Sequence, residues 1–67
     1  MQSNKQPQGY RIYAKLPGEN RYYALGGGSV VKNLIYAELW YELEDCLKVL
    51  VHVQAMNPDI KFEVRSA

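Results

Sequence analysis

The stretch ELEDCLKVLVHVQAM, residues 42–56, decides the fold of this 67-residue chain, because it is the longest segment with a helical apolar repeat. The apolar residues that recur every three or four positions are Leu43, Cys46, Leu47, Leu50 and Val53. Acidic Glu42, Glu44 and Asp45 crowd the first turn, where the helix dipole favours negative charge. Asn57-Pro58 ends the pattern, because a residue before proline avoids the α region. The sequence predicts one amphipathic helix over residues 42–56.

The segments around this helix have the two-residue repeat of half-buried strands. YRIYAKL, residues 10–16, alternates between apolar and polar positions, and IKFEVR, residues 60–65, does the same. RYYAL, residues 21–25, follows the turn Pro17-Gly18-Glu19-Asn20, where proline fixes φ and glycine is free to take φ > 0. We therefore expect an antiparallel hairpin before the helix and one strand after it.

Residues 30–41, VVKNLIYAELWY, are compatible with helix or with strand. Ser29 is a suitable N-cap, but a helix over residues 29–56 is long for so small a domain. Val, Ile, Tyr and Trp also suit a pleated surface. We favour a third strand centred on residues 34–40, with the helix beginning near Tyr41 or Glu42 without a good N-cap. GGGS, residues 26–29, then forms a flexible hairpin loop, because it lacks the Lys-Ser/Thr pair of a phosphate-binding loop.

The predicted fold is a small two-layer α+β domain with element order ββ(β)αβ. Residues 10–67 form the single domain, and residues 1–9, which are polar, form a disordered lead-in. We expect the strand order 3-2-1-4, with the last strand parallel to the first because a helical crossover restores chain direction. The residues expected beneath the helix are Ile12, Leu34 or Ile35, Ile60, Phe62 and Val64.

Composition excludes several classes of site. The net charge is +1, and the chain has one cysteine and one histidine. It therefore has no internal disulfide and no complete zinc site. Cys46 and His52 are six residues apart, which places them on different sides of a helix and not in a nucleophile–base pair. We expect no enzymatic activity and no cofactor.

Hydropathy predicts a location in the cytoplasm. The chain has no apolar run of about 18 residues or more, so we expect no transmembrane helix. MQSNKQPQG, residues 1–9, lacks the apolar region of a secretory signal.

The exposed sheet face is the first candidate site. It would carry the basic and aromatic residues Arg11, Tyr13, Lys15, Arg21, Tyr23, Lys61 and Arg65. Single-stranded nucleic acid binds such surfaces by base stacking and phosphate contacts. The alternative, which we favour, is that the tyrosines cover an exposed sheet and the Arg and Lys stems lie over them.

A protein interface is the second candidate. The chain contains six tyrosines and one tryptophan but only one phenylalanine. Tyr and Trp are frequent at interface hot spots. Trp40 with Tyr22, Tyr23 and Tyr36 is more aromatic surface than one helix covers. The alternative is that Trp40 and Tyr36 pack at the end of the helix with their polar tips in water.

Three segments of the chain carry a resemblance to other sequences: YRIYAK at residues 10–15, NLIYA at 33–37 followed by Trp40, and NPDIKFEVR at 57–65. Together they resemble a group of small uncharacterised proteins encoded in bacterial phage and mobile elements. The likeness covers most of residues 10–65. In the sequences of that group, a helix follows the NLIYA strand. This chain departs from the group at Tyr41, where a capping Thr, Ser or Asp is common. The resemblance implies an intracellular accessory protein and transfers no binding residues.

The sequence therefore favours a non-enzymatic protein-interaction or homodimeric accessory module. Its partner would be a protein or a second copy of the chain, and no membrane. Weak, sequence-tolerant binding of nucleic acid is the alternative.

Overall fold

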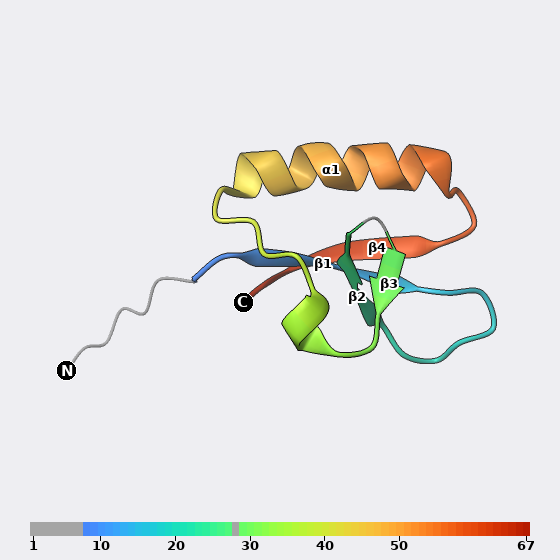
Figure 1. Ribbon diagram of the computed structural model, residues 1–67. Helices are drawn as coiled ribbons and strands as arrows, with labels where there is room; N and C mark the ends of the chain where they lie inside the picture. The colour runs from blue at the N-terminus through green and yellow to red at the C-terminus, as the bar shows by residue number, and fades with distance from the viewer. Residues whose placement is uncertain (1–7, 28) are drawn as a thin grey trace.

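The computed structural model describes residues 8–27 and 29–67. Its regular elements, in chain order, are β1 (Tyr10–Lys15), β2 (Tyr23–Gly26), β3 (Ser29–Val31), the 3₁₀ turn η1 (Leu34–Tyr36), α1 (Leu43–Met56) and β4 (Lys61–Ser66). The four strands form one antiparallel sheet in the order β3-β2-β1-β4, and α1 lies along one side of it (Figure 1). The predicted α+β class and the predicted strand order are both confirmed.

The β1–β4 ladder is the centre of the sheet, with pairs running from Tyr10↔Ser66 to Lys15↔Lys61. Ile12 and Ala14 alternate with polar neighbours along β1 and are fully buried on the side that faces α1. Cys46 supplies the buried side chain of the helix. The partly buried residues packed against this core are Tyr10, Trp40, Val49, Leu50, Val53, Phe62 and Val64. The alternating pattern of the sequence therefore identified the correct inner face of both long strands.

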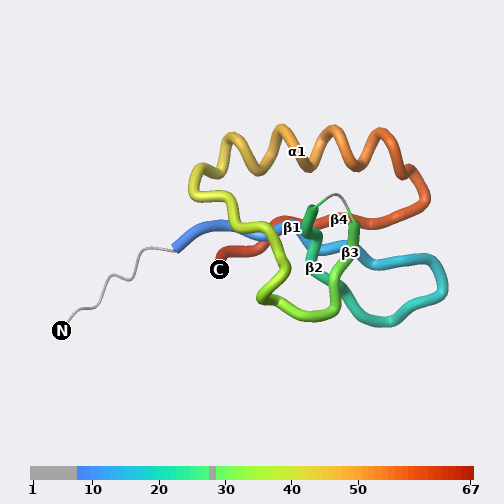
Figure 2. The backbone as a smooth tube through the Cα atoms, viewed as in Figure 1, coloured from blue at the N-terminus to red at the C-terminus, as the bar shows by residue number. Residues whose placement is uncertain are grey.

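The prediction that the last strand runs parallel to the first is wrong, because β4 is antiparallel to β1 along its whole length. After β3 the chain returns to the start of β1 before the helix begins (Figure 2). There the backbone of Trp40 exchanges two hydrogen bonds with that of Tyr10, with N···O distances of 2.7 and 2.9 Å. The helix thus begins beside the start of β1 and ends beside its end, so β4 must run backwards.

The predicted third strand centred on residues 34–40 is also wrong. The third strand is the three-residue β3. Either Leu34 or Ile35 was expected beneath the helix, but both lie exposed in η1. Asn33 caps this turn, since its side-chain oxygen accepts a hydrogen bond from the Ile35 backbone N–H at 3.1 Å. Asparagine side chains favour such turns because they compete with strand pairing for the backbone.

Glycine makes the close packing of η1 possible. A Cβ built on Gly26 would lie 2.2 Å from the Tyr36 carbonyl oxygen, so the two backbones touch where any side chain would block them. Gly26 also pairs with Ser29, so GGGS forms the tight β2–β3 connection; Gly28 lies outside the described residues.

The helix prediction is confirmed to within one residue. Glu42 is the N-cap, with an extended backbone and no side-chain capping bond, as the missing cap residue in the sequence indicated. Asn57 ends the helix, and both its backbone N–H and its side-chain amide donate to the Val53 carbonyl at 3.0 Å.

The first nine residues are described only in part. Residues 1–7 of the predicted lead-in lie outside the described residues. Gly9 is buried, and its carbonyl accepts a hydrogen bond from the Ala67 N–H at 2.8 Å.

Candidate interaction surfaces

The sheet side that faces away from α1, here called the open face, gathers most of the predicted site residues. Register places three directly opposed pairs on it: Arg11 with Arg65, Tyr13 with Glu63, and Lys15 with Lys61. These residues alternate with the buried positions of the same strands, so their side chains point away from the helix.

Arg65 organises the open face. Its guanidinium carbon lies 4.5 Å from the ring centre of Tyr13 and 4.9 Å from that of Tyr22. Its Nε also forms an ion pair with Glu63. Each exposed cation–π contact contributes about 0.5–1 kcal/mol. The rings of Tyr13 and Tyr22 are thus already in contact with a cation of the same chain.

Two like-charged pairs remain on the open face. Arg11 lies opposite Arg65, and Lys15 lies opposite Lys61. Like charges directly opposite each other destabilise a ladder. The Arg11 Nε is enclosed and has no hydrogen-bond partner in the part of the chain that is described. An anionic partner across these pairs would reduce the repulsion between the like charges.

Tyr23 is not on the open face, contrary to the prediction, and Trp40 of the predicted aromatic interface is not on it either. Tyr23 pairs with buried Ala14 and therefore shares the face that α1 partly covers. Its hydroxyl lies 3.4 Å from Glu19 Oε1. Trp40 packs against the core. Arg21 is exposed and lies before β2 begins.

Tyr22 is the open-face residue that the predicted set missed. Alternation in RYYAL contained the signal: Leu25, an apolar core residue, has the same parity as Tyr23 and the opposite parity to Tyr22.

Exposed apolar side chains are the second notable surface feature. Among the described residues, the buried hydrophobic positions are Ile12, Ala14, Ala24, Leu25 and Cys46. The large hydrophobic residues that stay exposed are Val30, Leu34, Ile35, Tyr36, Tyr41, Leu43, Leu47, Val51 and Met56. The helix therefore covers less apolar surface than the chain carries, and the excess lies mainly on α1 and η1.

Three of these residues form what we call the helix row: Leu43, Leu47 and Val51, spaced four apart on α1. Their exposed fractions are 43%, 41% and 69%. Leu47 and Val51 share their side of the helix with Gln54, whose amide donates to the Ile60 carbonyl just before β4 at 2.9 Å. Val53 lies on the core-facing side of α1 instead, where it lines an apolar groove with residues that include Leu25 of β2 and Phe62 of β4. Because Gln54 reaches the segment just before β4, the helix row lies on the β4 side of α1.

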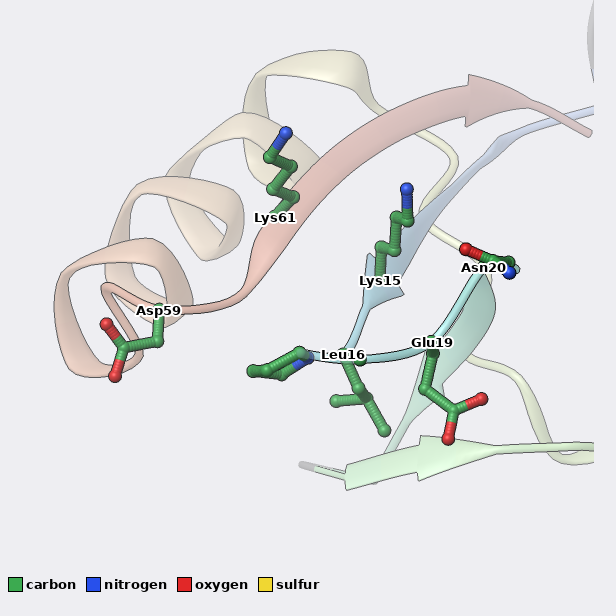
Figure 3. A pocket seen from close by; sticks show the side chains of 8 residues that line it. Lys15, Leu16, Glu19, Asn20, Asp59 and Lys61 are labelled. Carbon is green, nitrogen blue, oxygen red and sulfur yellow. The ribbon is translucent and has the colours of Figure 1, made fainter.

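A shallow hollow lies where the β1–β2 turn meets the loop before β4 (Figure 3). The residues that line it are Lys15, Leu16, Pro17, Gly18, Glu19, Asn20, Asp59 and Lys61. Lys15 and Lys61 extend side by side from adjacent strands, while Asp59 and Glu19 lie on the loops around them (Figure 3). The hollow adjoins the Lys15 end of the open face, and its two lysines are balanced by the carboxylates of Glu19 and Asp59.

Cys46 and the other metal-ligating residue types do not form a site. Burial raises the pKa of the Cys46 thiol, which therefore remains a neutral core side chain. No group of three or more His, Cys, Asp or Glu side chains comes together within residues 8–27 and 29–67. Over the same residues, no helix is long and apolar enough to cross a membrane.

Comparison with known proteins found no matching family model, no matching curated protein and no matching solved structure.

Proposed function

We propose that this domain is a non-enzymatic protein-interaction module that associates through its exposed apolar side chains. The observation that carries the proposal is the imbalance between the small buried core and the large hydrophobic residues left exposed on α1 and η1. A domain of this size gains little stability from its own core, so covering that surface with a partner stabilises it. Exposed apolar rows of this kind mark protein interfaces. An intracellular accessory role in a mobile element, which the resemblance implies, fits such a module.

Sedimentation velocity from micromolar to near-millimolar concentration tests this proposal, together with affinity capture from cells that express the protein. We expect a species heavier than the monomer, or a captured partner, that is lost in Leu47→Lys. Association should weaken about tenfold or more, because the new charge would be buried in the interface. Ala55→Lys is the matched control, since it adds the same charge at another exposed position of α1. A monomer at every concentration, with no capture that depends on Leu47, would contradict the proposal.

A second candidate function is sequence-tolerant binding of single-stranded nucleic acid by the open face. The observation that favours it is the pair of like-charged cross-strand contacts, Arg11 with Arg65 and Lys15 with Lys61, which lie on either side of Tyr13. Phosphate groups would neutralise these cations, and displacement of Arg65 would free the Tyr13 ring to stack on a base.

Fluorescence anisotropy of a labelled single-stranded oligonucleotide, titrated at several salt concentrations, tests this second function. Four phosphate contacts predict a slope of about −3 for the logarithm of the binding constant against that of salt. Arg11→Ala should reduce the steepness by about 0.7. Tyr13→Ala should weaken binding, whereas Tyr23→Ala should not, because Tyr23 lies on the other face. Binding that is independent of salt, or equally sensitive to both tyrosines, would refute it.

A further inference from the structure

Within the part of the chain that the structure describes, the outer edge of the six-residue strand β4 pairs with no other strand. Ala67 N–H donates to the Gly9 carbonyl, which makes these residues a hydrogen-bonded pair of the β1–β4 ladder. Such pairs recur at every second position, so the backbone groups of Lys61, Glu63 and Arg65 point toward β1. The backbone groups that point away from β1, here called the β4 edge, belong to Phe62, Val64 and Ser66.

We propose that two copies of this chain pair antiparallel through the β4 edge, about a twofold axis at Val64. The proposal rests on the proposed function and names its partner and its site. The two sheets then join into one continuous eight-stranded sheet, with both helices on the same side. An exposed strand of this length invites such pairing unless it is covered.

Charge complementarity selects the Val64-centred register. It places Glu63 opposite Arg65 of the other copy, twice by symmetry. A register centred on Glu63 would instead set Glu63 against Glu63 and Lys61 against Arg65. A register centred on Phe62 would also pair opposite charges, but it needs the Ile60 carbonyl, which already accepts a hydrogen bond from Gln54.

The position of the helix supports the same dimer. α1 contacts both β1 and β4 and lies over them (Figure 1). Strands are spaced about 4.8 Å apart, so the helix axis lies about 5 Å from the twofold axis beside β4. The two helices would then be about 10 Å apart, which is the distance of packed helices.

The helix row is the part of α1 that such a pairing covers. It lies on the β4 side of the helix, so the helix rows of the two copies face each other across the twofold axis. A single symmetric interface would therefore pair the backbone groups of the β4 edge and cover part of the exposed apolar surface.

Cross-linking with single-cysteine additions tests the register. Opposed residues at Glu63 and Arg65 would have Cα atoms about 4.5 Å apart, which suits a disulfide. We expect a disulfide-linked dimer when Glu63→Cys and Arg65→Cys proteins are mixed and oxidised. Neither variant should cross-link alone, because two copies of one position are about 8 Å apart, which is too far. Wild-type protein is the control for buried Cys46, and circular dichroism checks the fold of each variant.

Each outcome of this experiment separates the inference from the proposed function. Cross-linking of Glu63→Cys with itself would overturn the Val64 register. A dimer mass by light scattering without any cross-link in the mixture would overturn pairing through β4, while the interaction function would stand. A monomer at all concentrations would overturn the inference, and the interaction function would then depend on a captured partner that is lost in Leu47→Lys.

Discussion

At the residue scale, Gly26 illustrates how one missing side chain shapes the molecule. The Tyr36 carbonyl occupies the space where a Gly26 Cβ would lie, so η1 folds back against the end of β2. This contact holds the returning chain beside β2, where the Glu38 N–H also donates to the Leu25 carbonyl at 3.1 Å. The route of the chain to the start of α1 depends on this packing.

We therefore expect Gly26→Ala to be far more damaging than Gly18→Ala. At Gly26 the clash is with backbone, which cannot rotate away, so the free energy of unfolding should fall by about 3 kcal/mol or more. Gly18 has a φ of 81° and nothing within 4 Å of its Cβ position, so alanine there costs only about 1–2 kcal/mol of backbone strain. Urea unfolding of both variants at one protein concentration measures the difference, and equal losses would contradict the assigned contact.

The residue scale is also where sequence-based prediction failed most clearly. Tyr22 and Tyr23 are adjacent and chemically identical, so only the alternation with buried Leu25 shows which one faces the open side, and the prediction did not use it. Trp40 was placed in the candidate interface, with packing beside the helix as the alternative; its backbone pairs with Tyr10 and its side chain packs on the core. That long-range pairing leaves no local signal in the sequence.

At the element scale, α1 and the two strands β1 and β4 could be predicted, although not the antiparallel pairing of these strands, because each element has a strong repeat. Apolar residues recur at helical spacing in the helix and at every second position in the strands. Residues 30–41 could not be predicted, since valine and isoleucine there suggest strand while Asn33 and Gly26 impose a turn and a close contact. The predicted direction of β4 depended on the predicted strand in that segment, so it was wrong as well.

The start of α1 offers a stabilising change. Glu42 has the extended backbone of an N-cap, but its side chain makes no capping bond. Glu42→Asp keeps the charge and shortens the side chain to one that caps well, so unfolding should cost about 0.5–1 kcal/mol more. Glu44→Asp is the control, because it makes the same change inside the first turn. Thermal unfolding of the two variants measures the difference. A midpoint temperature for Glu42→Asp equal to or lower than that of Glu44→Asp would contradict this account.

At the scale of the whole molecule, the central claim is that the chain is built to be covered. Among the described residues, the buried core is small, α1 keeps an apolar row exposed, and the longer edge strand of the sheet, β4, lies on the same side of α1 as that row. Pairing through the β4 edge would bring these features into one interface and leave the open face accessible to an anionic partner.

Amide hydrogen exchange on wild-type protein at low and high concentration tests this claim most directly. The Glu63 and Arg65 amides point toward β1 and should be protected at both concentrations. The Phe62, Val64 and Ser66 amides should exchange rapidly in the dilute protein and become protected as concentration rises. Exchange that stays rapid at these three amides at every concentration would contradict pairing through β4.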